Sequence, residues 1–105
     1  MKIKIILGST RQGRVSEVIG KWVMEQAKNV AGLELELLDL RDFPLPFFDE
    51  PVSPSQIKEP YINPAVVKWI AKIAEGEAFI VVTPEYNHGY SAVLKNALDY
   101  VYKEW

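Results

Sequence analysis

Residues 78–89 read AFIVVTPEYNHG. The apolar start of this stretch, Ala78-Phe79-Ile80-Val81-Val82, is typical of a strand that is buried on both faces in a parallel sheet. A polar loop containing proline and glycine follows at once, and Ser91 is the predicted cap of a helix that begins after it. Doubly wound α/β proteins bind ligands at loops of this kind, at the carboxyl ends of parallel strands. The stretch therefore predicts both an α/β fold and a ligand site.

A second loop of the same kind follows the first apolar run of the chain, residues 2–7. It reads Gly8-Ser9-Thr10-Arg11-Gln12-Gly13-Arg14-Val15-Ser16, and a helical pattern continues over residues 16–30. Ser16 is the predicted N-cap of that helix, because a serine side chain can accept hydrogen bonds from the first turn. Parallel strands end at the same edge of a sheet, so the two loops are expected to form one site.

The remaining segments complete the pattern strand–helix–strand–helix–strand–helix. Residues 33–37 alternate between leucine and glutamate, which indicates a half-exposed edge strand. A proline-rich connection over 41–63 leads to a helix that Asn63 is expected to cap. The alternation of strands and helices along the chain implies a parallel sheet with right-handed crossovers. The first strand, over 2–7, is expected to lie between the other two, which gives the strand order 2-1-3.

Helical spacing predicts which apolar side chains face the core. The predicted inward sets are Val18, Ile19, Trp22, Val23 and Ala27 on the first helix, Val67, Ile70, Ala71 and Ala74 on the second, and Leu94, Ala97, Leu98 and Val101 on the third.

Composition narrows the class of protein. The chain has 105 residues, of which 49% are hydrophobic, enough for the core of one domain. A net charge of -2 provides no basic surface for nucleic acid. With no cysteine and one histidine, disulfides, thiolate chemistry and a metal site are not expected. No apolar run is long enough for a signal peptide or a membrane span, so a cytoplasmic location is expected.

The first loop has the chemistry of an anion site. Ser9, Thr10 and Ser16 can donate hydroxyl hydrogen bonds, and Arg11 or Arg14 can contact two phosphate oxygens at once. The loop also enters the amino end of a helix, where unpaired N–H groups and the helix dipole favour an anion. A plain serine–glycine turn with two solvated arginines is the alternative interpretation of the loop.

Three related classes of site do not fit. A nucleoside-triphosphate loop would need lysine and a magnesium-binding hydroxyl where this chain has Arg14 and Val15. No G-x-G-x-x-G fingerprint for a dinucleotide follows the first strand. A receiver domain would need carboxylates where Gly8-Ser9 and Thr83-Pro84 stand. A terminal phosphomonoester, such as that of flavin mononucleotide (FMN), remains.

Together these motifs resemble the NADPH-dependent FMN reductase family, a flavodoxin-like group of flavin and quinone reductases. The resemblance extends over essentially the whole chain but covers only the first part of the family's domain. It rests on Gly8-Ser9-Thr10-Arg11 with Ser16, on Asp39-Leu40-Arg41, on Thr83-Pro84-Glu85-Tyr86-Asn87, and on Leu94-Lys95-Asn96-Ala97-Leu98-Asp99.

The resemblance implies a flavoprotein that passes hydride from NADPH through FMN to a quinone, a flavin or a similar acceptor. It implies no catalytic acid–base side chain, because the cofactor carries the chemistry. The residues implied to bind FMN are Ser9, Arg11 and Ser16 at the phosphate, with Arg14 contributing, and Pro84, Glu85, Tyr86 and Asn87 along the ribityl chain and the ring.

The resemblance also implies that residues 1–105 form a single but incomplete flavodoxin-like domain, because family members continue with further strands and a third flavin loop. The uniformly apolar strand over 78–83 is then expected to lack a neighbour and to pair with another chain, so a homo-oligomer or a swapped assembly is predicted. The alternative function is a half-domain that binds flavin weakly or not at all and serves as an oligomeric scaffold. The electron acceptor, the choice between NADPH and NADH, and a natural or engineered origin of the shortened domain stay open.

Overall fold

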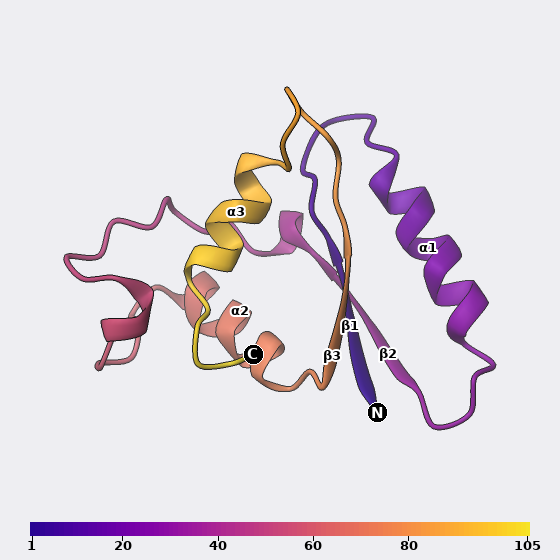
Figure 1. The fold of residues 1–105 in the computed structure, drawn as a ribbon, viewed down its shortest axis with the longest axis horizontal. Coiled ribbons are helices and arrows are strands. Elements are labelled where there is room, and N and C mark those ends of the chain that lie inside the picture. The colour runs from indigo at the N-terminus through magenta and orange to yellow at the C-terminus, as the bar shows by residue number, and fades with distance from the viewer.

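A computed structural model describes all of residues 1–105 and contains the predicted alternation of strands and helices (Figure 1). Two short 3₁₀ turns, η1 (Leu40–Asp42) and η2 (Pro54–Gln56), interrupt the long connection. The main elements are β1 (Lys2–Leu7), α1 (Ser16–Ala27), β2 (Glu34–Asp39), α2 (Pro64–Ala74), β3 (Ala78–Val82) and α3 (Ala92–Asp99).

The sheet confirms the predicted topology. Its three strands are parallel and lie in the order β2-β1-β3. In this register Ile5 of β1 lies between Leu37 of β2 and Ile80 of β3. All three strands therefore end at the same edge, and the loops that follow β1 and β3 come from neighbouring strands.

Helices cover both faces of the sheet, so the chain has the three layers of a flavodoxin-like fold. Figure 1 shows α1 on one side of the sheet and α2 with α3 on the other. The larger core lies under α2 and α3 and includes Ile6, Trp69 and Leu94. A smaller core, formed by Ile5, Leu7 and Val82, lies on the α1 side.

The predicted inward face of α1 is largely wrong. Val18 and Trp22 are 68% and 61% exposed, whereas Ser16 and Gly20 are buried. A Cβ atom added to Gly20 would overlap the side chain of Leu7, so only glycine lets the helix approach β1 this closely. Because the small residues face the sheet, an apolar stripe of α1 remains on the surface.

The predicted face of α2 is correct only at Ile70, which is partly buried against the larger core. Val66, Trp69 and Ile73 are buried, and Val67 is 47% exposed. Trp69 is fully buried, and its indole Nε1 donates a hydrogen bond of 2.9 Å to the carbonyl oxygen of Ala97 on α3. This bond satisfies the buried indole N–H and joins the two helices above the sheet. The caps predicted for α2 and α3, Asn63 and Ser91, are confirmed by hydrogen bonds from the first turn of each helix.

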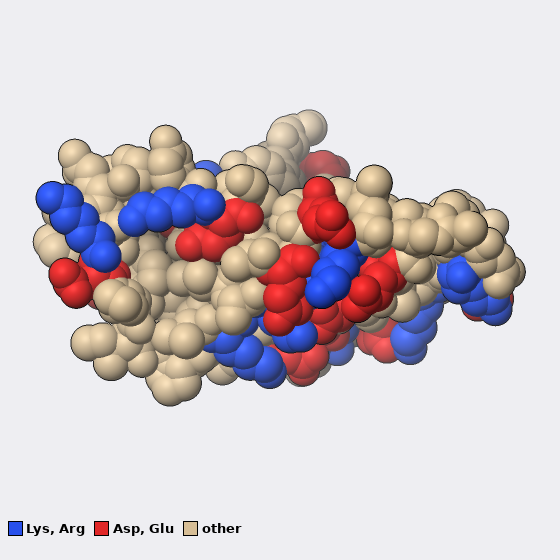
Figure 2. Space-filling view, turned by 90° about the horizontal axis from the view of Figure 1, so that it is seen from below, with Lys and Arg blue, Asp and Glu red and all other residues tan.

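The end of the sheet where the strands begin carries a network of ion pairs. Lys4 of β1 is buried, and its ammonium group contacts the carboxylates of Glu36 and Glu75, while Lys72 contacts both glutamates. Burial would lower the pKa of Lys4, but the hydrogen bonds to Glu36 and Glu75 outweigh it and raise that pKa. Figure 2 views the molecule from below and shows acidic and basic side chains intermixed. The network lies at the end of the sheet opposite the two loops.

None of the helices combines the length and the apolar composition that crossing a bilayer requires.

Candidate functional site

The two loops meet at the carboxyl edge of the sheet, as predicted. The backbone N–H of Gly8 donates to the carbonyl oxygen of Val82 at 2.8 Å, and the Ser91 hydroxyl donates to the carbonyl oxygen of Gly8. The side-chain oxygens of Ser9 and Tyr86 lie 3.1 Å apart, within hydrogen-bonding distance. Residues more than 70 positions apart in the sequence thus form one continuous surface.

The first loop presents unpaired donors at the start of α1. Ser16 is the first residue of the helix rather than its cap, and Val15 occupies the cap position without a side-chain hydrogen bond. The Ser16 hydroxyl is buried and has no hydrogen-bond partner within the chain. The backbone N–H groups of Gly13, Val15, Ser16 and Glu17 also have no acceptor. A buried hydroxyl without a partner is costly, so this arrangement suits an anionic ligand that accepts from these groups.

Arg11 and Arg14 occupy different environments, although the sequence places both in the anion site. Arg11 is exposed and forms no ion pair, and its guanidinium donates only to the carbonyl oxygen of Gln12 at 3.1 Å. Its guanidinium is therefore available to a ligand. The side chain of Arg14 is only 3% exposed and points into the protein.

Arg14 is committed to an internal ion pair. Its guanidinium donates through two nitrogens to both carboxylate oxygens of Asp39, at the end of β2, and through Nη1 to the carbonyl oxygen of Ser9 at 2.6 Å. Glu17 lies 3.5 Å away. The hydrogen bonds from Arg14 hold the pKa of the Asp39 carboxyl below its usual value. Arg14 thus ties the first loop to β2 through its two terminal nitrogens, while its buried Nε has no hydrogen-bond partner, and its contact with phosphate stays a prediction.

Asp39 is the residue of this site to which sequence reasoning assigned no role. The signal was present, since Asp39 is the only carboxylate directly at the carboxyl end of β2 and faces a loop that carries two arginines. Asp39 also accepts a hydrogen bond of 2.9 Å from the backbone N–H of Arg41 and so begins η1.

The second loop is a tight hairpin that its own backbone holds in place. Tyr86 and Gly89 exchange backbone hydrogen bonds of 2.8 and 3.1 Å. The two residues between them, Asn87 and His88, have φ angles of 52° and 68°, as a type I′ turn requires. The Glu85 carboxylate accepts from the backbone N–H of His88 at 2.6 Å. The loop therefore has a defined shape before any ligand binds.

Among the predicted residues, the contact between the two loops is made by Ser9 and Tyr86. The hydroxyl groups of Tyr86 and Ser9 lie within hydrogen-bonding distance. Pro84 is half-buried, while Glu85 and Asn87 are exposed in the hairpin. Because its carboxylate already supports the turn, Glu85 has mainly a positioning role in this structure.

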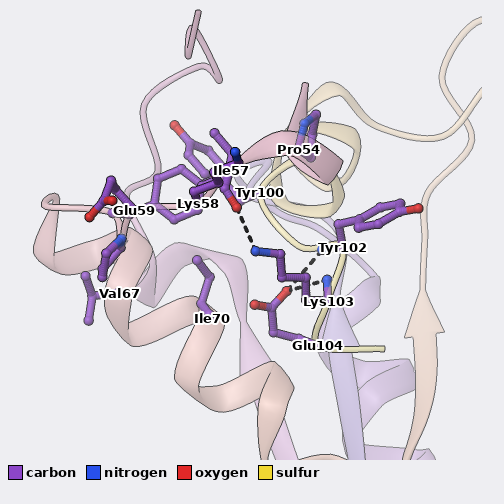
Figure 3. Close-up of a pocket in the computed structure, with 12 residues that line it drawn as sticks. Pro54, Ile57, Lys58, Glu59, Val67, Ile70, Tyr100, Tyr102, Lys103 and Glu104 are labelled. Carbon is purple, nitrogen blue, oxygen red and sulfur yellow. Dashed lines mark hydrogen bonds between the residues drawn. The ribbon is translucent and has the colours of Figure 1, made fainter. Parts of the chain in front are cut away.

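A cavity elsewhere in the chain has no connection with the two loops. It measures about 250 Å³ and lies between the long connection, α2 and the residues that follow α3 (Figure 3). Lys103 closes one side by donating to the carbonyl oxygen of Ile57 at 2.6 Å. Burial raises the pKa values of Tyr61 and Tyr100, which line it. None of the predicted site residues lines this cavity.

Comparisons with known proteins identify relatives of this chain. Among curated proteins, an NAD(P)H-dependent FMN reductase of Schizosaccharomyces pombe is 43% identical over 104 residues, covering 99% of this chain and 52% of the relative. An NAD(P)H:quinone oxidoreductase of Solanum tuberosum is 32% identical over 101 residues, covering 95% of this chain and 49% of the relative. The chain therefore spans about half the length of these relatives.

A solved structure shares the fold. The flavoenzyme NAD(P)H:(acceptor) oxidoreductase FerB from Paracoccus denitrificans superposes with a TM-score of 0.69 at 26% identity, covering 94% of this chain and 49% of FerB. The sequence profile of the NADPH-dependent FMN reductases matches residues 1–105, the whole chain. The chain belongs to the NADPH-dependent FMN reductase family.

Proposed function

We propose that this chain is the FMN-binding part of an NADPH-dependent reductase. The observation that carries the proposal is the buried Ser16 hydroxyl, which has no partner within the chain and stands beside unpaired N–H groups at the start of α1. A phosphate group supplies the acceptors that these donors lack. The uncharged ring of the same ligand would then extend toward the second loop.

Each predicted residue receives a role in this proposal. Ser16 and Ser9 donate hydroxyl hydrogen bonds to phosphate, and the exposed guanidinium of Arg11 neutralises its charge. Arg14 acts indirectly, because its bonds to Asp39 and to the Ser9 carbonyl fix the loop. The hairpin residues line the ribityl chain and the ring: Pro84, Glu85, Tyr86 and Asn87.

The chemistry expected of the intact site needs few side chains. Bound FMN supplies the ability to accept hydride from NADPH and to pass it to a quinone, a flavin or a similar acceptor. The residues of this chain bind the phosphate, fix the hairpin and exclude water from one side of the ring. A general acid or base has no required place in this scheme.

The proposal is tested by titrating FMN and riboflavin with the purified chain and following flavin fluorescence. FMN should bind at least about tenfold more tightly than riboflavin, because a charge-assisted hydrogen bond contributes about 1.5–3 kcal/mol. Ser16→Ala should weaken FMN binding by about tenfold or more and leave riboflavin binding unchanged. Ser55→Ala, in an exposed segment remote from both loops, is the matched control.

Equal affinities for FMN and riboflavin would remove the phosphate site from the proposal. No binding of either flavin by folded protein would favour the second candidate function, an oligomeric scaffold. A specific observation supports that candidate: β3 is a sheet edge, and its Ile80 and Val81 are 37% and 40% exposed. Open edges of this kind pair readily with another chain.

We infer that the 105-residue chain on its own self-associates through β3. Light scattering coupled to size-exclusion chromatography should give a mass above 12.0 kDa that falls toward this value on dilution. Ile80→Lys, which places a charge on the open edge, should shift the equilibrium toward monomer, whereas Lys21→Gln on the outer side of α1 should not. A monomer at all concentrations would contradict this inference and weaken the scaffold candidate.

A further inference from the structure

A separate cavity lies beside the first loop, between η1, the start of the long connection and α3. It measures about 370 Å³, within the range of pockets that hold small molecules. Its wall is mainly apolar and includes Leu40, Phe43, Leu45, Phe47 and Val93. No residue proposed above to bind FMN is among those that line it.

Arg41 gives this apolar cavity a single cation. The side chain is exposed, and its Nη2 donates to the carbonyl oxygen of Arg11 at 2.8 Å. Its Nε and Nη1 have no acceptor, and none of the ion pairs in the chain includes Arg41. The nearby carboxylate of Asp39 is already occupied by Arg14, and Asp42 forms no ion pair. Arg41 therefore has donors to spare for an anion.

The other polar groups of the cavity show which ligand groups it can satisfy. The Asn96 side chain is partly used, since it donates one N–H to the carbonyl oxygen of Pro46 and accepts from the backbone N–H of Phe48, both at 2.9 Å. The Thr10 hydroxyl has no hydrogen bond within the chain, so it can donate one. Arg41 and Thr10 both have free donors at the cavity, and these donors favour a ligand oxygen.

Phe47 adds a flat apolar surface. Its side chain is 78% exposed, whereas Phe43 is buried with its ring edge against Trp69. The bonds from Asn96 to residues 46 and 48 hold the backbone on both sides of Phe47, so the exposed ring is carried by an anchored segment. An aromatic side chain at a pocket mouth suits stacking against a planar ring.

We propose that this cavity binds an aromatic anion, a planar ring that bears a carboxylate or a sulfonate. The ring lies among Leu40, Phe43, Phe47 and Val93, and the guanidinium of Arg41 pairs with the anionic oxygens through two nitrogens. Thr10 donates a further hydrogen bond to the same group. The site is distinct from the phosphate site at Ser16 and does not depend on the proposed flavin function.

The test uses naphthalene-2-carboxylate and its uncharged counterpart, naphthalene-2-carboxamide, with the full chain in the absence of flavin. Binding is followed by isothermal titration calorimetry and by shifts of backbone amide signals in NMR spectra. The carboxylate should bind about tenfold more tightly than the carboxamide, as expected for a charge-assisted pair in a partly desolvated pocket. The shifted signals should include those of residues 40–48 and 93–96.

Two variants test the role of the Arg41 charge and the role of the cavity separately. Arg41→Gln should remove the preference for the carboxylate, while Lys2→Gln, which removes an unpaired cation at the opposite end of β1, should leave it intact. Val93→Trp fills the cavity and should abolish binding of both probes. If Arg41→Gln proves unfolded by circular dichroism, the result with Val93→Trp and the preference of the parent chain still decide the matter.

Equal binding of the two probes, or a preference that survives in Arg41→Gln, would overturn the proposal. So would unchanged binding in Val93→Trp. Competition by FMN for the carboxylate would show that the cavity belongs to the flavin site rather than standing apart from it. A failure of FMN to bind the chain leaves these outcomes unaffected, so the two proposals are judged separately.

Discussion

Removing the charge of Asp39 tests whether the ion pair with Arg14 holds the first loop. In Asp39→Asn the guanidinium of Arg14, whose side chain is 3% exposed, loses the nearer of its two anionic partners. Breaking a buried pair from one side costs about 3–5 kcal/mol. The Asp39 side chain is 22% exposed, and Arg14 keeps the Ser9 carbonyl and Glu17, so we expect about 2–3 kcal/mol.

The loss is measured by urea unfolding at one fixed protein concentration, followed by far-ultraviolet circular dichroism. For a chain of this size, 2–3 kcal/mol corresponds to a fall in Tm of about 10–20 °C. Asp99→Asn is the matched control, because Asp99 pairs with Lys95 in an exposed i,i+4 arrangement on α3. Such exposed helical pairs contribute about 0.3–0.5 kcal/mol.

A double-mutant cycle with Arg14→Met separates the pair from the other contacts of each residue. A coupling free energy of about 1–3 kcal/mol is expected for groups in direct contact. A loss below about 0.5 kcal/mol in Asp39→Asn, equal to that of the control, would refute the reasoning and free Arg14 for contact with a ligand.

Three further predictions concern packing and pH. Gly8→Ala should cost about 1–3 kcal/mol, because the added Cβ would lie 3.1 Å from a side-chain carbon of Leu94 and from the carbonyl oxygen of Val82. Gly89→Ala should be nearly neutral, because the nearest atom lies 3.8 Å from the added Cβ. If urea unfolding gave equal losses of stability for the two variants, the neighbours of Gly8 would have moved to make room for the added methyl group. Trp69→Phe should cost about 1–3 kcal/mol through the lost indole bond and the void, and a neutral result in the same assay would show that the site repacks. The pKa of Asp39 is lower in the folded chain than its ordinary value of about 3.9. The carboxylate therefore contributes fully to folding stability above that ordinary pKa, and this contribution is lost as the pH falls through the lower pKa of the folded state. Unfolding curves over this acid range should show a shallower pH dependence in Asp39→Asn, and identical slopes would contradict the assignment.

The topology and the location of the site could be predicted from the sequence for a simple reason. β3 is uniformly apolar and β2 alternates, so the two strands could be told apart. Both are edge strands in this sheet, and Ile80 and Val81 of β3 are 37% and 40% exposed rather than buried. Proline and glycine then marked where each strand ended. The boundary of β2 was nevertheless placed two residues early, because Leu38 and Asp39 continue the strand after the alternation stops.

The rotation of α1 about its axis could not be predicted in the same way. The side that faces the sheet carries Ser16 and Gly20, which have no hydrophobic signal, while the surface side carries Val18 and Trp22. Close approach of the backbone to β1 decided the orientation, and close approach is a property of three-dimensional packing.

The partner of Arg14 could not be predicted from the sequence for a related reason. Composition identifies a guanidinium that can bind phosphate, but only the register of β1 and β2 places Asp39 within reach. The hairpin at Asn87 and His88 was equally hidden, since the usual signal for a type I′ turn is glycine at the second central position and this chain has histidine.

The bonds between the two loops have a consequence for the order of folding. The Ser91 hydroxyl reaches the carbonyl of Gly8 across 83 positions of sequence, so these contacts form only when a loop that includes most of the chain has closed. No locally folded piece, such as α1 with its preceding loop, can present the complete surface. A ligand held by both loops would therefore stabilise the chain as a whole, by about 2.7 kcal/mol at one hundred times its Kd.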